Sequence, residues 1–204
     1  TRRDLLEVSS ARAHAAVPPA PFLSGGDAGG RRDGDLVLTV GTVEPRKGVE
    51  CLLEAAKNVS GWDRPIRFVL VGRPGWNSDR LIAGLRAAHA DPDTPFEWRE
   101  EVDDSALAGL YRQAAVVLQP SRAEGFGLPL AEALSTGAAI LARDIPVFRE
   151  VVADDSSFFR IDAELPAALQ RRIAAPRPSQ PARFGWSWDD AAAALLAAIR
   201  SHGG

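Results

Sequence analysis

The chain has 204 residues, a formal net charge of −3 and a hydrophobic content of 46%. This length fits one domain with tails, and the slightly acidic balance argues against a nucleic-acid binder, which usually carries a basic excess. The single cysteine, Cys51, excludes an internal disulfide framework and indicates a reducing compartment, and no apolar run reaches the roughly 18 residues of a membrane span.

Residues 1–35 are rich in proline and glycine after a short predicted helix over 1–15. They lack the basic and apolar regions of a signal peptide. The chain contains no methionine, which suggests a piece of something longer. We therefore expect residues 1–35 to be a linker or N-terminal extension with little core of its own.

From residue 36 onward, short apolar runs alternate with helix-period runs. Buried strands are predicted over 36–43, 66–72, 114–119 and 138–143, with a weaker one from 96. Helices are predicted over 49–59, 79–90, 103–113, 128–136, 147–152 and 163–174, and residues 176–204 are expected to form a C-terminal helical tail. This alternation predicts an α/β fold, with a doubly wound, Rossmann-like parallel sheet over 36–175.

The stretch that most strongly indicates function runs from Pro120 to Gly137, where a buried strand is followed by a glycine loop and a helix. The helix is expected to bury an apolar face formed by Leu128, Leu130, Ala131 and Leu134. Its N-terminus, opened by the glycine loop, would offer backbone N–H groups to an anion. Glu124 and Glu132 beside an anion site are better suited to accept hydroxyl groups, and a nucleotide sugar has hydroxyls at both ends of a diphosphate. The alternative is an ordinary strand, loop and helix with a solvated glutamate at each end.

A second motif, GTVEPRKG, follows the first strand and brings two cations to the same edge of the sheet. Gly41 would let a ligand approach, while Arg46 and Lys47 would stabilise the negative charge that gathers on a diphosphate leaving group. The alternative is two solvated charges at a helix start, which is disfavoured because cations destabilise a helix N-terminus unless an anion joins them.

The segment PSRAEGFGLPLAEAL resembles the EX7E signature of retaining GT-B glycosyltransferases of the large family-4 type. The resemblance covers residues 36–152 well and implies one half of a GT-B fold, the C-terminal half that binds the sugar donor. It implies catalytic roles for Glu124 near the donor sugar and for Arg46 and Lys47 at the diphosphate, and it implies that Glu132 binds the ribose hydroxyls. The nucleotide-sugar contacts that it implies are Gly41, Gly72, Arg73, Val102, Leu107, Ser121, Gly125, Phe126, Gly127, Leu128 and Glu132.

The sequence also departs from the family pattern, because Thr136-Gly137 is not followed by the usual proline and a later Pro-Glu motif is replaced at Arg149-Glu150. These departures affect the expected loop shape more than donor binding. The dinucleotide fingerprint fails because Leu130 stands at its third glycine position, which disfavours an NAD-dependent oxidoreductase.

No metal and no other cofactor is expected. The two D-x-D segments, at Asp33 and Asp91, lie in turn-forming sequence. His14, His89 and His202 are too far apart in the sequence to suggest a ligand cluster.

We therefore expect a retaining glycosyltransferase domain that binds a nucleotide-diphosphate sugar, with GDP-mannose slightly favoured over a UDP-sugar, and transfers the sugar to an acceptor hydroxyl. An N-terminal Rossmann-like acceptor domain is expected outside this chain. The alternative is a non-catalytic nucleotide-sugar-binding module, or an isolated half that needs a separate acceptor domain. The expected location is the cytoplasm, with peripheral contact to the inner membrane face through the other domain as one option.

Overall fold

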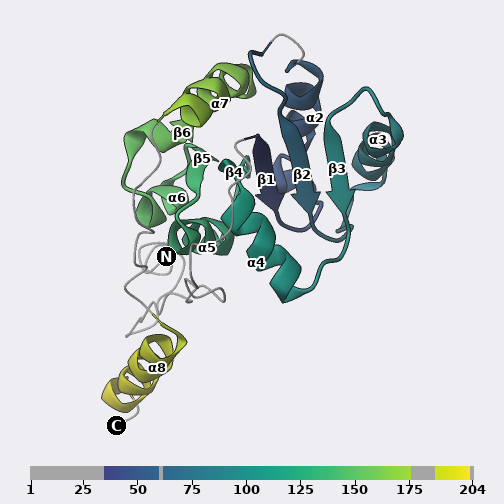
Figure 1. The fold of residues 1–204 in the computed structure, drawn as a ribbon. Helices are drawn as coiled ribbons and strands as arrows, with labels where there is room; N and C mark the ends of the chain where they lie inside the picture. Colours follow the sequence, from purple (N-terminus) through teal and green to yellow (C-terminus); the bar gives the residue numbers. More distant parts are fainter. Residues whose placement is uncertain (1–34, 60–61, 176–186, 203–204) are drawn as a thin grey trace.

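The computed structural model describes residues 35–59, 62–175 and 187–202, and six strands within them form one parallel sheet. The strands are β1 (Leu36–Val40), β2 (Arg67–Val71), β3 (Phe96–Arg99), β4 (Val116–Gln119), β5 (Ala139–Arg143) and β6 (Phe158–Phe159). Their order is β3-β2-β1-β4-β5-β6, and every neighbouring pair is parallel. The chain thus builds outward from β1 to β3 and then returns, so that β4 lies on the other side of β1 (Figure 1). The predicted doubly wound parallel sheet is confirmed.

Helices cover both faces of this sheet. One core contains α2 (Glu50–Lys57), α3 (Asp79–Ala90) and α7 (Leu165–Ala174), and the other contains α4 (Asp104–Gln113), α5 (Leu128–Thr136) and α6 (Pro146–Val151). Because successive strand residues point to opposite faces, β1 places Val37 in the first core and Leu36 and Leu38 in the second. All three side chains are fully buried, as expected for a strand covered on both faces.

The helix boundaries follow local signals. Asp103 caps α4, and its carboxylate accepts a hydrogen bond from the Ala106 N–H at 2.7 Å. Pro146 and Pro166 stand in the first turns of α6 and α7, where a missing N–H costs least. The helix predicted over 163–174 is therefore divided into η3 (Asp162–Glu164), a short 3-10 turn, and α7.

Two expectations were wrong in detail. Leu130 and Ala131 of α5 are buried as predicted, together with Ala133 and Ser135, whereas Leu128 and Leu134 are only half-buried. The buried stripe is shifted because α5 packs against both β4 and β5 and presents its small residues to them. Strand β6 was not predicted at all, since two residues are too few to show a period.

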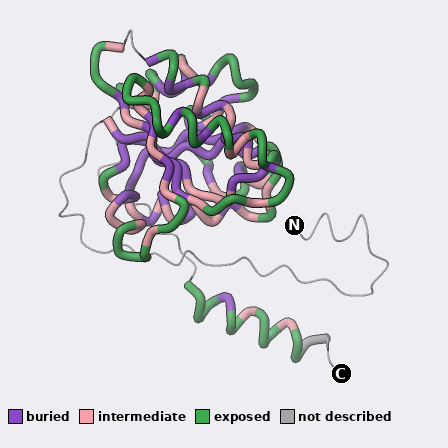
Figure 2. Tube along the Cα trace, turned by 90° about the vertical axis from the view of Figure 1, so that its right-hand side faces the viewer, coloured by how far each residue is buried: buried purple, intermediate pink, exposed green. Residues whose placement is uncertain are grey.

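The predicted tail contains α8 (Trp188–His202), whose Leu195, Leu196 and Ile199 are each more than half exposed. Figure 2 shows this helix as mostly exposed, in contrast to the buried strands of the sheet. The expected linker over 1–34 and residues 176–186 of the tail lie outside the described residues. Among the described residues, no helix combines the length and apolarity required to cross a membrane.

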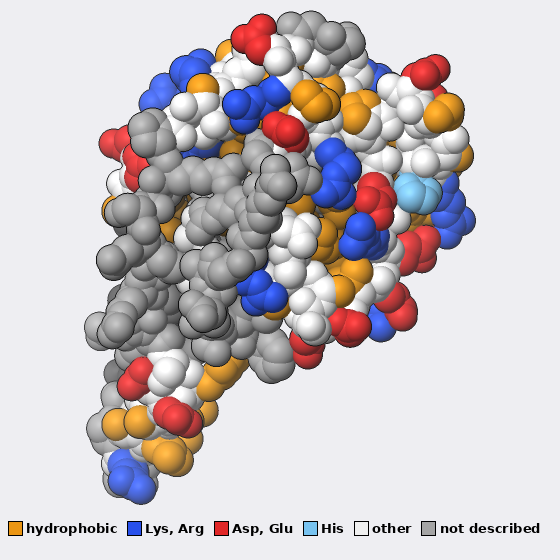
Figure 3. All heavy atoms as spheres, viewed as in Figure 1, with side chains coloured by type: hydrophobic (Ala, Val, Ile, Leu, Met, Phe, Trp, Pro, Cys, Tyr) orange, Lys and Arg blue, Asp and Glu red, His pale blue; other side chains and the backbone are white. Residues whose placement is uncertain are grey.

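The surface carries charges of both signs. Figure 3 shows basic and acidic side chains in small mixed groups over the visible face. Several charged side chains of the described residues form ion pairs, such as Arg86 with Glu100 and Arg99 with Glu97. This distribution agrees with a formal net charge of only −3.

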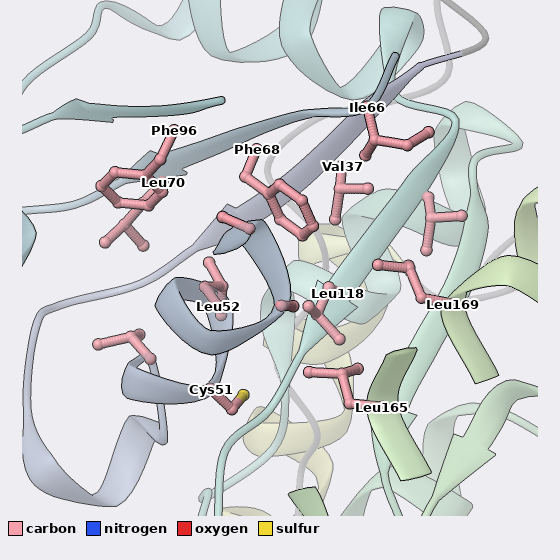
Figure 4. Close-up of a cluster of buried hydrophobic side chains, with 14 of the residues drawn as sticks. Val37, Cys51, Leu52, Ile66, Phe68, Leu70, Phe96, Leu118, Leu165 and Leu169 are labelled. Atoms are coloured by element: carbon pink, nitrogen blue, oxygen red, sulfur yellow. The ribbon is translucent and has the colours of Figure 1, made fainter. Parts of the chain in front are cut away.

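Cys51 packs as a small apolar residue in the first core. Cys51 is only 4% exposed. Figure 4 shows it on α2 beside Leu52, with Leu118, Leu165 and Leu169 in the same cluster. Burial raises the pKa of its thiol from 9.0 to about 12, with smaller opposing contributions from nearby acidic and basic side chains.

This shift predicts a loss of stability at alkaline pH. The native thiol keeps a proton that the unfolded chain releases above pH 9, so its contribution is fully present below pH 9 and is lost as the pH rises toward 12. Between pH 7 and pH 10 we expect this group to lower the free energy of unfolding by roughly 1 kcal/mol. Urea unfolding of the parent and of Cys51→Ala at both pH values checks this, because the variant should be less stable throughout yet lose less between them. An equal loss in both proteins would contradict it.

Candidate functional site

The two motifs that the sequence singled out meet between β1 and β4, where the order in which the chain adds strands to the sheet reverses. Gly41 directly follows β1 and Pro120 directly follows β4, and these two strands are neighbours in the sheet. Ligands of open α/β sheets bind outside the carboxyl ends of the strands at such a reversal of strand order. In Figure 1 the arrowheads of β1, β2 and β3 point to the same edge. The predicted meeting of the motifs at one edge is therefore confirmed.

The loops after β1 and β4 are held against each other by backbone contacts. The first loop contains η1 (Pro45–Lys47), a 3-10 turn, and the Arg122 N–H donates to the Arg46 carbonyl at 2.7 Å. Gly48 has a φ of 63°, and a Cβ there would lie 2.5 Å from the Pro120 carbonyl oxygen. The Arg143 guanidinium donates to this same oxygen at 2.8 Å. The position of η1 is thus fixed relative to the start of the second loop.

Glu124 is the centre of a compact charge cluster at this junction. Its carboxylate accepts hydrogen bonds from Lys47 Nζ at 2.5 Å, from the Ser121 hydroxyl at 2.8 Å and from Arg46 at 3.1 Å. We call Arg46, Lys47, Ser121 and Glu124 the Glu124 cluster. Its carboxylate side chain is 8% exposed and the Lys47 side chain 12%, so their attraction is only weakly screened by water.

The cluster is formally close to neutral once Glu44 is included. Glu44 Oε2 lies 2.8 Å from Arg46 Nε, although the geometry does not make a hydrogen bond and this buried oxygen has no hydrogen-bond partner. Two carboxylates therefore balance two cations. The sequence assigned Glu124 and Lys47 to different parts of a ligand, whereas the structure pairs them, so an incoming anion would compete with Glu124 for Lys47.

The N-terminus of helix α5 lies beside the cluster. The helix begins after Gly127, which has a φ of 94° and, as a glycine, provides no side chain to cap it. The first N–H groups of a helix carry the positive end of its dipole. Gly125 is exposed and Phe126 and Leu128 are half-buried, which places the predicted loop residues at the surface of the junction.

Glu132 lies on the second turn of α5 and is half-buried. Its Oε2 accepts a hydrogen bond from the Tyr111 hydroxyl of α4 at 2.7 Å. The sequence did not predict this hydrogen bond, because the two residues lie 21 positions apart on different helices.

The remaining predicted site residues come after β2 and β3, at the same edge of the sheet. Arg73 is largely exposed and pairs with Glu101 at 3.0 Å. Val102 and Leu107 are half-buried and pack against the second core. Gly72 packs directly against the first motif, since a Cβ there would lie 2.0 Å from the Gly41 carbonyl oxygen. Its glycine is thus required by packing, a role that the sequence did not suggest.

A network of ion pairs behind the second loop was also missed by sequence reasoning. Arg122 contacts Glu50 and, at 3.2 Å, Asp162, and Arg143 pairs with the same Asp162. The sequence did contain one indication of this network. Arg143 ends the buried run 138–143, and a charged side chain at the end of a buried strand needs an oppositely charged or hydrogen-bonding partner.

A groove of 480 Å³ lies between α2 and the start of α7. Its lining combines apolar side chains with the acidic groups of Glu50, Glu54 and Asp162. An acidic rim opposes the binding of a phosphate, so we do not place the nucleotide there.

The D-x-D segment at Asp91 forms a turn, in which its carboxylate accepts from the Asp93 N–H at 3.0 Å and the Thr94 hydroxyl at 2.7 Å. The segment at Asp33 lies outside the described residues. Over the part of the chain that the structure describes, no group of three or more metal-ligating side chains is found.

Comparison with known proteins identifies the family of the chain. Residues 28–175 match the family "Glycosyl transferases group 1". The serotype-specific mannosyltransferase WbdA of Escherichia coli is 34% identical over 136 residues, which is 67% of this chain and 16% of the relative. The phosphatidyl-myo-inositol mannosyltransferase of Mycolicibacterium smegmatis is 33% identical over 153 residues, 74% of this chain and 37% of the relative. The chain thus spans well under half the length of these relatives.

Solved structures share the fold. The pneumococcal O-GlcNAc transferase GtfA in complex with UDP and GlcNAc superposes with a TM-score of 0.67 at 19% identity, over 98% of this chain and 39% of that one. An α,α-trehalose-phosphate synthase from Burkholderia xenovorans gives 0.64 at 15% identity, over 83% and 44%. These are GT-B glycosyltransferases, and the likeness shows that the chain has the fold of one half of such an enzyme. Together with the family match over most of its length, this shows that the chain belongs to the glycosyl transferases group 1 family.

Proposed function

We propose that this domain binds a nucleotide-diphosphate sugar at the junction of the β1 and β4 loops and provides the donor half of a retaining glycosyltransferase. The observation that carries the proposal is the convergence of Lys47, Arg46 and the N-terminus of α5 at the point where the strand order reverses. All three features favour an anion, and a diphosphate is large enough to contact them together.

The chemistry follows from these charges. As the bond between the sugar and the diphosphate breaks, negative charge builds on the leaving phosphate oxygens. Lys47 and Arg46 would stabilise this charge in the transition state, and the N–H groups at the start of α5 would add fixed dipoles. These groups would serve the role that a metal ion has in other transferases, and we propose that none is required.

The two glutamates would orient the donor. Glu124 lies beside the proposed phosphate position and would accept sugar hydroxyls once Lys47 turns to the diphosphate. Glu132 lies on the second turn of α5 and would accept the ribose hydroxyls at the nucleoside end. The residues after β2 and β3, including Arg73 and Val102, would lie nearer the base.

The curated relatives named as mannosyltransferases support a mannosyl donor such as GDP-mannose over other hexosyl donors. The relatives are much longer than this chain, which supports an acceptor domain outside it. The alternative, a domain that binds the donor without transfer by itself, is favoured by this same difference in length.

Calorimetric titration of the purified chain with UDP, GDP and ADP at one ionic strength tests the proposal. We expect saturable binding of at least one nucleoside diphosphate, with GDP preferred, and an affinity that falls as salt is added, because cation–phosphate contacts are screened. Transfer requires a separate assay with the acceptor domain restored. Absence of binding for all three nucleotides would refute the proposal.

A further inference from the structure

Tyr111 is the only tyrosine in the chain. It lies on α4 and is fully buried in the second core. Its hydroxyl group does not end in an apolar region but reaches the Glu132 carboxylate of α5 at 2.7 Å. The two helices contact each other directly, so this hydrogen bond joins neighbouring elements.

The ring could be held in place by packing alone, but the hydroxyl group requires its partner. A buried hydroxyl without a hydrogen bond is costly, and Glu132 supplies the acceptor. Burial and the adjacent negative charge of Glu132 both raise the pKa of Tyr111 well above its ordinary value, so the phenol keeps its proton and remains a donor at neutral pH.

This hydrogen bond restricts a flexible side chain. A glutamate on a half-buried helical surface has several rotamers, and fixing one of them at the moment of binding costs conformational entropy. Because Oε2 is held by Tyr111, the direction of the whole carboxylate is set before a ligand arrives. A carboxylate has about four lone-pair positions, and the bond from Tyr111 occupies one of them.

We propose that Tyr111 is a positioning residue that orients Glu132 toward the ribose of the nucleotide and thereby sets the preference for ribonucleotides over deoxyribonucleotides. The inference rests on the proposed function, because it assumes that Glu132 receives ribose hydroxyls. It assigns to Tyr111 a role in selectivity rather than in the chemistry of transfer.

The test compares Tyr111→Phe with the parent chain, using the nucleoside diphosphate that the parent binds best and the 2′,3′-dideoxy form of that nucleotide. The variant removes only the hydroxyl and keeps the ring in the core. We expect the affinity of Tyr111→Phe for the ribonucleotide to fall by roughly 3- to 10-fold, the effect of one net hydrogen bond. Its affinity for the dideoxy form should equal that of the parent, so the preference for ribose shrinks.

Two further variants separate positioning from folding. Glu132→Gln should also reduce the ribose preference, and the double variant should lose no more than the more affected single variant, because both changes act on the same contact. Circular dichroism of each variant checks that the domain remains folded.

The outcomes are distinguishable. An equal loss of affinity for both nucleotide forms in Tyr111→Phe would show a structural role and overturn the inference, as would unchanged affinity for both. A parent that binds both forms equally would overturn it while leaving diphosphate binding intact. A parent that binds no nucleoside diphosphate would refute the proposed function itself.

Discussion

Replacing Gly72 with alanine is expected to lower the free energy of unfolding by about 2–6 kcal/mol, which adds the strain of an unfavourable backbone conformation to the cost of overpacking. Gly72 has a φ of 157°, and the added Cβ would lie 2.0 Å from the Gly41 carbonyl oxygen. The Cβ would meet a backbone atom, and Gly41 and Gly72 directly follow the last register pair of β1 and β2, Val40 with Val71, so the carbonyl cannot move away without disturbing this pairing. Since domains are stable by about 5–15 kcal/mol, the variant would be partly unfolded or close to it.

Gly109→Ala is the matched control for this experiment. Gly109 lies inside α4, and a Cβ there would meet no atom within 4 Å. The same chemical change should therefore stabilise the domain by about 0.5–1 kcal/mol through helix propensity. Urea unfolding followed by circular dichroism gives both values. A Gly72→Ala variant as stable as the parent would show that the contact with Gly41 is not rigid.

Lys47→Ala and Glu124→Gln are expected to change the affinity for a nucleoside diphosphate in opposite directions. Lys47→Ala removes a cation from the proposed phosphate site and should weaken binding by about 10- to 150-fold, the usual value of a hydrogen bond to a charged group. Glu124→Gln removes the carboxylate that accepts a hydrogen bond from Lys47 Nζ at 2.5 Å. The phosphate then no longer has to compete with a negatively charged side chain for Lys47. Binding of the sugar-free nucleotide should then become several-fold tighter, while transfer of the sugar should be lost.

Calorimetry with the same nucleoside diphosphate measures both effects. Lys57→Ala is the matched control, because Lys57 is the only other lysine of the chain and its side chain is 59% exposed on α2. It changes the net charge as Lys47→Ala does but should leave the affinity unchanged. If Glu124→Gln weakened binding as strongly as Lys47→Ala, the competition between carboxylate and phosphate would be excluded.

The elements of the fold were predictable where a local pattern was long enough. Helix α3 has the predicted bounds, Asp79–Ala90, because its period is regular over three turns. Strand β6 was missed because two residues carry no period. The strand order depends on pairing between distant segments, such as Val37 with Val116, and no local pattern encodes it.

The site was predictable in its location but not in its contacts. The sequence predicted that Arg46, Lys47 and Glu124 would gather at one edge, and the structure brings all three into contact. It did not predict that Glu124 would neutralise Lys47, because this pairing depends on how two loops 77 residues apart in the chain are folded against each other. The hydrogen bond between Tyr111 and Glu132 was not predictable either, because a tyrosine on an apolar helix face gives no sign of where its hydroxyl points.

The most direct test of the account is a crystal structure of the chain grown with GDP, or with whichever nucleoside diphosphate binds best in the titration. The account predicts phosphates between Lys47 Nζ and the backbone at Gly125 to Leu128, with Glu124 turned away from the lysine and the ribose hydroxyls at Glu132. A nucleotide bound in the groove between α2 and α7, or phosphates that do not touch Lys47 while the Glu124 cluster stays intact, would contradict it.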